Sequence, residues 1–116
     1  MNTELLIKTR DYIQANPEEL AMAQWDCGTT ACIGGLACRL AGKPMTVLVQ
    51  GRYKQLDHAR TVLELDLVQA RDLFFLDSWP SDLRYRHEIA EEEGTAAEVA
   101  AERINRFLEQ YSAVVG

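Results

Sequence analysis

Residues 27–42 read CGTTACIGGLACRLAG, and this stretch decides the fold that we expect for the whole chain. Its pattern predicts a helix over about residues 30–41, in which Arg39 is the only charged residue. A helix that is apolar on nearly every face belongs at the centre of a bundle. The sequence therefore predicts that this helix is the core element of the protein.

The expected boundaries of this helix follow from its flanking residues. Thr29 or Thr30 can cap its start, and Gly42 can end it. Gly34 and Gly35 each cost a helix about 1 kcal/mol relative to alanine. We expect close approach by a neighbouring helix to offset that cost.

Hydrophobic periodicity and capping residues predict further helices on both sides of this core element. The expected elements are 4–15 after a Thr3 cap, a short turn after Asn16-Pro17, 54–65, 66–75 with Asp66 and Gln69 as a capping box, Ser81 to Gly94, and Thr95 to about 111 with Thr95 and Glu98 as a second capping box. Residues 45–50 fit a short extended stretch and an irregular loop equally well.

The expected fold class is all-α, a compact orthogonal bundle of five to six short helices around the helix of residues 30–41. Helices of about ten residues joined by turns cannot form the long seam of a parallel bundle. The 116 residues contain no internal repeat and no linker long enough to divide them. We therefore expect one helical domain over residues 1–116.

The formal net charge of −6 at pH 7 limits the expected partners. Its field repels phosphate backbones and anionic lipid headgroups, so we expect no nucleic-acid partner and no membrane partner. Mimicry of DNA is a weaker idea, because this charge is ordinary for the length. The N-terminal residues do not resemble a secretory signal, and no run approaches about 18 apolar residues. We expect a cytoplasmic protein.

Three cysteines, Cys27, Cys32 and Cys38, are crowded into one short segment. An odd number in one place is not a disulfide framework, so we expect free thiols. A thiol in the first turn of a helix, where we expect Cys32, can have a lowered pKa and react. Cys27 and Cys32 are separated by four residues, whereas dithiol oxidoreductases favour two. Buried structural thiols are therefore the favoured interpretation.

A zinc site would need these thiols together with His58 or His87. The Cys-x4-Cys-x5-Cys spacing matches no common zinc knuckle or ribbon. Cys32 and Cys38 are six positions apart, which is about 240° around a helix, so they point to different faces. The sequence therefore predicts no metal and no cofactor.

Signs of catalysis are weak. His58 follows Asp57 and His87 precedes Glu88, but adjacent residues on a helix do not face each other. The chain contains no Gly-x-Ser-x-Gly elbow, no glycine-rich phosphate loop and no His-Glu-x-x-His. Our interpretation leans against an enzyme, and we predict no catalytic residue.

Four glutamates crowd one segment, Glu88, Glu91, Glu92 and Glu93. They suit the docking of a basic partner, although a solvated helix face is the more ordinary explanation. Phe74, Phe75 and Trp79 are expected as core and loop anchors rather than as a ligand platform.

Two segments carry a family resemblance: Trp25 followed by CGTTACIGGLA over residues 27–37, and LFFLDSWP over residues 73–80. The chain resembles small bacterial and phage proteins that have a Trp…Cys-Gly-Thr-x-x-Cys-x-x-Gly-x-Ala segment and a Leu-Phe-x-x-x-x-Trp-Pro segment. The similarity reaches from about residue 15 to 111. Leu36 departs from the Trp or His common in those proteins, and Glu64-Leu65-Asp66 replaces a turn that contains glycine. The resemblance implies a shared helical fold and transfers no catalytic residue.

The resemblance singles out one candidate functional cluster, Trp25, Cys27, Gly28, Thr29 and Cys32. The account that we favour for it is architectural. Thr29 is expected to cap the central helix, Gly28 to permit a sharp entry into it, and the two thiols to pack beneath Trp25.

The leading functional hypothesis is a non-enzymatic protein-interaction or regulatory module, because no catalytic constellation is present and the surface is acidic. The alternative is a thiol-dependent activity, redox or metal-binding, centred on Cys27 and Cys32. The oligomeric state does not follow from the sequence.

Overall fold

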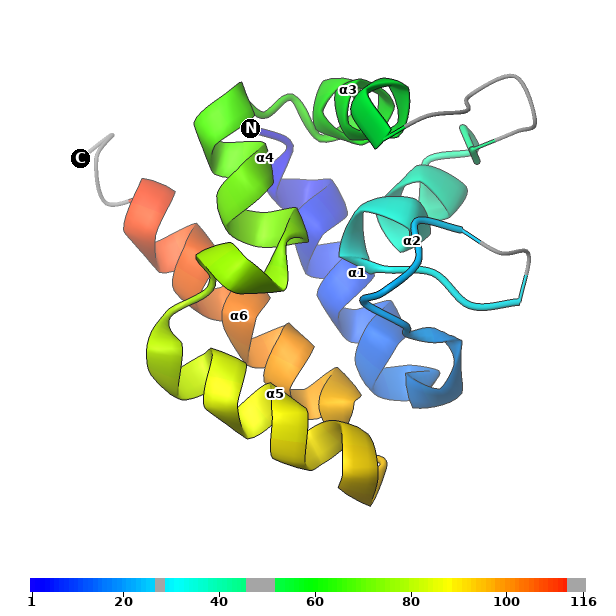
Figure 1. Cartoon of the computed structure of the whole chain (residues 1–116). Helices are drawn as coiled ribbons and strands as arrows, with labels where there is room; N and C mark the ends of the chain where they lie inside the picture. The colour runs from blue at the N-terminus through cyan, green and yellow to red at the C-terminus, as the bar shows by residue number, and fades with distance from the viewer. Residues whose placement is uncertain (27–28, 46–51, 113–116) are drawn as a thin grey trace.

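The computed structural model describes residues 1–26, 29–45 and 52–112 (Figure 1). These residues form six α-helices and two single 3-10 turns, with no strand among them. The helices are α1 (Thr3–Ala15), α2 (Ile33–Leu40), α3 (Arg52–Leu63), α4 (Leu67–Phe74), α5 (Ser81–Glu93) and α6 (Ala96–Ser112), and the turns are η1 (Pro17–Glu19) and η2 (Leu76–Ser78). The all-α prediction is confirmed.

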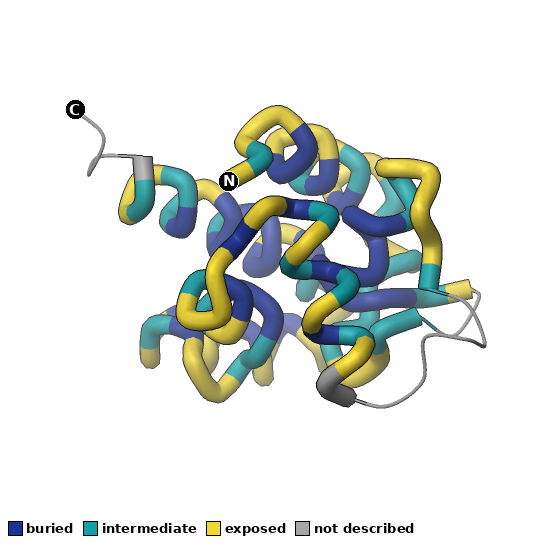
Figure 2. The backbone as a smooth tube through the Cα atoms, turned by 90° about the horizontal axis from the view of Figure 1, so that it is seen from above, coloured by how far each residue is buried: buried dark blue, intermediate teal, exposed yellow. Residues whose placement is uncertain are grey.

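Helix α2 occupies the position expected of the core element. Every residue from Ile33 to Cys38 is buried, and the helix packs against α1, α3 and α4. Buried apolar side chains from all six helices join one cluster around it. Figure 2 shows that the buried parts of the helices turn inward and the exposed parts outward.

The helices cross rather than run as a parallel bundle. Figure 1 views α3 along its axis, whereas α1, α5 and α6 run across the view. Helix α6 packs against both α1 and α5. Its apolar positions are buried at Ala97, Ala100, Ala101, Ile104 and Phe107, and half-buried at Leu108 and Tyr111.

The start of α2 lies three residues later than predicted. Its N-cap is Cys32, whose side chain makes no capping hydrogen bond, so neither Thr29 nor Thr30 caps the helix. The cause is the loop before it. Ala31 forms backbone bridges to both Leu20 and Asp26, which keeps the chain extended up to the cap. The end of the helix is as predicted, since Gly42 has a left-handed φ of 73° just beyond it.

The two glycines of α2 lie close to different neighbours. At Gly34 an added Cβ would lie 3.0 Å from the ring of Trp25, 3.2 Å from Ala59 of α3 and 3.3 Å from Phe74 of α4. This is the expected close approach of neighbouring helices. At Gly35 the neighbour is a loop instead, because an added Cβ would lie 1.7 Å from the backbone oxygen of Trp25.

Other helix boundaries were predicted with mixed success. The capping box at α4 is confirmed, with the Gln69 amide donating to Asp66 at 2.8 Å and the Asp66 amide to Gln69 at 3.0 Å. Gly94 ends α5 in a left-handed conformation, with φ 77°. Ser81 is the first residue of α5 rather than its cap, because the cap position falls on Pro80.

Two further boundaries are corrected. Asn2, not Thr3, caps α1, because its side-chain oxygen accepts a hydrogen bond from the Leu5 amide at 3.1 Å. Helix α3 spans Arg52–Leu63 rather than 54–65, and Glu64 leaves the helix with a positive φ of 56°. Residues 45–50, for which an extended stretch and an irregular loop are equally open, lie, apart from Met45, outside the described residues.

The contact at Gly35 yields a stability prediction. We expect Gly35→Ala to lower the free energy of unfolding by more than about 3 kcal/mol, because its Cβ would overlap the Trp25 carbonyl and neither backbone can yield easily. Gly34→Ala is the matched control and should cost less, since most of its neighbours are side-chain atoms. Urea denaturation of both variants measures this difference. A Gly35→Ala protein as stable as the parent would contradict the packing described here.

Candidate functional site

A polar network holds the segment of residues 17–26 against the central helix. Arg39 on α2 donates to the Asp26 carboxylate through two nitrogens, with Nε at 2.9 Å, and its Nη1 lies 3.8 Å from Glu19. Tyr12 on α1 donates to Glu19 at 2.8 Å, and this bond raises the pKa of Tyr12. The hydrogen bonds with Asp26 likewise raise the pKa of Arg39. The single charge of α2 is therefore a structural link.

Backbone hydrogen bonds complete this attachment. The amide of Ala31 donates to Glu19 and the amide of Ala21 donates to Ala31, both at 2.9 Å. The amide of Cys32 donates to Gln24 at 2.8 Å. These bonds hold residues 19–24 beside Ala31 and Cys32, which directly precede α2.

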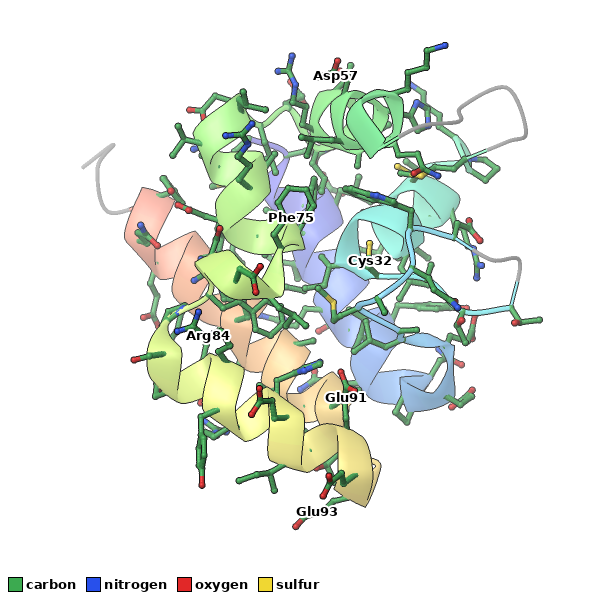
Figure 3. All side chains as sticks on the ribbon, in the orientation of Figure 1. Cys32, Asp57, Phe75, Arg84, Glu91 and Glu93 are labelled. Carbon is green, nitrogen blue, oxygen red and sulfur yellow. The ribbon has the colours of Figure 1, made fainter. Side chains whose placement is uncertain are left out.

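Trp25 and Cys32, two members of the candidate cluster, lie close to each other. The Trp25 ring stands edge-on to Phe74 and Phe75, with ring centres 5.7 and 6.0 Å away. The Cys32 sulfur lies 4.0 Å from the Trp25 backbone oxygen, and the residue is 3% exposed. Figure 3 shows Asp57 projecting outward from α3, whereas Cys32 is buried and Phe75 is half-buried.

The other three members of the candidate cluster are not brought together with Trp25 and Cys32 in the described part of the chain. Thr29 is exposed and does not cap α2. Cys27 and Gly28 lie outside the described residues, so the sharp entry expected at Gly28 and the packing expected for Cys27 stay predictions.

The two described cysteines, Cys32 and Cys38, are free and buried. Burial raises the pKa of Cys32 to about 11 and that of Cys38 to about 12. Cys32 stands at the N-cap of α2, and the backbone amides of Gly34 and Gly35 lower its pKa, but burial outweighs them. Both thiols are therefore protonated near neutral pH, which weakens the thiol-dependent hypothesis at Cys32.

A concave surface, which we call the aromatic hollow, adjoins Cys32. It has a volume of 390 Å³. Its lining is Met22, Ala23, Gln24, Trp25, Cys32, Gln55, Phe74 and Phe75. Phe75 thus borders a surface cavity in addition to anchoring the loop.

A second hollow, which we call the His87 groove, lies between residues 17–23 and helices α5 and α6. It has a volume of 530 Å³ and is lined by Pro17, Glu18, Leu20, Ala21, Met22, Ala23, His87, Glu91, Gly94, Ala96 and Ala97. Met22 and Ala23 line both hollows. The two therefore meet at these residues.

His87 is the one buried histidine among the described residues, with 2% of its surface exposed. Its Nδ1 lies 3.2 Å from the Glu91 carboxylate, and its ring stands edge-on to Trp79 at 5.6 Å. Burial lowers the pKa of His87 more than Glu91 and Glu88 raise it. The imidazole is therefore neutral near pH 7, with its Nδ1 beside the Glu91 carboxylate.

From the sequence, the only partner considered for His87 is the adjacent Glu88, so the pair with Glu91 is missed. Side chains four residues apart on a helix do face each other, so this spacing is the signal that could have found Glu91. Figure 3 shows Glu91 on the side of α5 that faces the N-terminal part of the chain.

A third hollow, which we call the acidic hollow, shares His87 and Glu91 with the His87 groove. It has a volume of 460 Å³ and is lined by Leu76, Asp77, Arg84, His87, Glu88, Glu91 and Glu92. The run of glutamates is exposed, as a solvated face requires, but three of its four members also border this concave surface.

The other candidate ligands do not converge. His58 lies on α3, and its Nε2 is 2.8 Å from the backbone oxygen of Lys43. Cys32 borders the aromatic hollow and His87 the other two. Within residues 1–26, 29–45 and 52–112, no group of three or more His, Cys, Asp or Glu side chains is placed to hold a metal ion.

The burial of the thiols predicts slow chemical modification. At pH 8, iodoacetamide should label Cys32 and Cys38 at least about 100-fold more slowly in the native protein than in urea, because a thiol needs its thiolate form and access to react. Peptide mass spectrometry assigns the label to each cysteine. Rapid native labelling of Cys32 would restore the thiol-dependent hypothesis.

The environment of His87 predicts a pH dependence. Because burial lowers its pKa in the folded protein, the unfolded chain binds the proton more readily. Stability is therefore retained above the ordinary histidine pKa of about 6.5 and falls as the pH drops below it. Chemical denaturation from pH 7.5 to 5.5 should show this loss in the parent protein and a flatter profile in His87→Gln. Parallel profiles would show that His87 does not titrate in this way.

In comparisons with known proteins, no family model matches this chain, and no curated protein or solved structure matches it significantly. The resemblance to the small bacterial and phage proteins stays a prediction. No helix in the described part of the chain combines the length and the apolar character that a membrane span needs.

Proposed function

We propose that this protein is a non-enzymatic protein-interaction module, and that its partner docks where residues 17–24 meet helices α4, α5 and α6. The observation that carries the proposal is the meeting of the aromatic hollow and the His87 groove at Met22 and Ala23. Joined concave surfaces suit a polypeptide, which can place successive side chains in them.

The composition of these surfaces supports the proposal. Leu20, Met22 and Ala97 provide apolar contact in the His87 groove, and aromatic rings provide it in the aromatic hollow. Interfaces are enriched in aromatic residues and methionine. Glu18 and Glu91 border the groove with groups that can form ion pairs at a polar rim.

The thiol-dependent alternative has less support. Cys32 borders a hollow, yet it is nearly inaccessible and its pKa is raised to about 11. A buried thiol with a raised pKa serves packing more readily than redox or metal chemistry. Free thiols also fit the reducing cytoplasm in which we place the protein.

Ala23 allows a direct test, because it is exposed and borders both hollows. Ala23→Arg should obstruct docking without disturbing the core. Val68→Arg is the matched control, because Val68 is 67% exposed on α4 and borders neither hollow. Circular dichroism and thermal melting verify that both variants fold like the parent.

The readout is quantitative affinity capture from native lysate at physiological salt. We expect at least one protein to be recovered by the parent and by Val68→Arg, and to be reduced about tenfold or more with Ala23→Arg. Equal recovery by all three proteins would place the interaction elsewhere. Recovery of no specific protein would count against an interaction module.

A further inference from the structure

We infer that the docking surface recognises a short basic polypeptide segment that carries one bulky apolar side chain. This inference rests on the proposed function and names the chemistry of the partner. The apolar side chain would occupy the aromatic hollow, and the basic residues would lie along the His87 groove and the acidic hollow. A hot-spot side chain buried in a pocket with charges at the rim is a common division of labour at interfaces.

The aromatic hollow accounts for the apolar side chain. Four of its eight lining residues, Met22, Trp25, Phe74 and Phe75, are large and apolar, and Gln24 and Gln55 contribute uncharged amides. No charged side chain lines it in the described part of the chain. An aliphatic or aromatic side chain can enter it without stripping water from an ionised group.

The charged side chains that line the His87 groove and the acidic hollow are mostly negative. The His87 groove is bordered by Glu18 and Glu91, with no Lys or Arg among its described lining residues. The acidic hollow adds Asp77, Glu88 and Glu92. Opposite charges on a partner would steer its approach and fix its register.

The neighbouring positive groups do not outweigh this charge. Arg84, the one cation among the described residues that line the acidic hollow, donates to the backbone oxygen of Asp77 at 3.2 Å and keeps its charge, so it offsets one of the four carboxylates there. The other candidate, His87, is held neutral by its burial. The ion pairs of α5 with α6, which involve Asp82 and Arg86, lie outside these three hollows.

The geometry favours a continuous segment over separate contacts. Met22 and Ala23 join the aromatic hollow to the His87 groove, and His87 and Glu91 join that groove to the acidic hollow. A segment anchored in the aromatic hollow therefore passes along the carboxylates as it leaves. A short peptide with one bulky apolar side chain and several basic residues can therefore contact all three surfaces at once.

The test is a selection of random 12-residue peptides displayed on phage against the folded protein, followed by fluorescence anisotropy with the enriched peptides. We expect enrichment of peptides that combine Lys or Arg with one aromatic or aliphatic residue. Their binding should be lost in Ala23→Arg and retained in Val68→Arg. Replacing the apolar residue of such a peptide by serine should weaken binding about tenfold or more.

Charge is tested separately with two double variants of equal net charge. Glu18→Lys with Glu92→Lys reverses two carboxylates of the proposed surface, whereas Glu4→Lys with Glu109→Lys reverses two that border none of the three hollows. The first pair should weaken peptide binding about tenfold or more, and the second should change it little. Equal weakening by both pairs would mean that only net charge matters, which would overturn the inference.

The remaining outcomes separate the inference from the proposed function. Peptides that depend on Ala23 but are neutral or acidic would overturn the inference and leave the docking surface in place. Failure to obtain any peptide sensitive to Ala23→Arg would count against the docking surface itself. A dimer by sedimentation that Ala23→Arg dissociates would assign the surface to a second copy of this chain instead.

Discussion

The structure depends on one close contact, the backbone oxygen of Trp25 against the bare Cα of Gly35. Any side chain at that position would occupy the space of the carbonyl. Because the loop can lie directly on α2, Arg39 reaches Asp26, and the Trp25 ring reaches α4. Glycine costs a helix about 1 kcal/mol, and here the packing of the loop and its ion pair offsets that cost.

This contact also sets the character of the surface. With Trp25 seated inward, the turn before it places Met22 and Ala23 between the aromatic hollow and the His87 groove. The nearby thiol is covered rather than presented, and its pKa rises accordingly. The same loop therefore makes Cys32 part of the core and leaves a joined concave surface outside it.

Negative charge is concentrated beside this concave surface. Most cations of the described C-terminal half are occupied within the fold: Arg106 pairs with Asp82, and the buried Arg103 donates to the backbone of Asp72 at 3.1 Å and lies over the Phe107 ring. The carboxylates near His87 have few such partners and face solvent. The buried imidazole lies beside Glu91 and is neutral, so it does not offset this charge. The result is a local negative field beside an apolar hollow, which is the basis for the partner chemistry inferred above.

The sequence by itself determined what depends on neighbours along the chain. Periodicity predicted the class of the helices and their number to within one, Asp66 with Gln69 marked the start of α4, and Gly94 marked the end of α5, because these signals act within one or two turns. The sequence also predicted that the helix expected over residues 30–41 is the buried centre, since a nearly uncharged helix cannot face water, and residues 33–38 of it are buried. Only the tertiary structure decided that Cys32 caps α2, that Gly35 meets a loop, and that His87 closes a groove bordered by residues 17–23. Each of those depends on segments that are distant in sequence, and no local pattern specifies which distant backbone or side chain will occupy a given space.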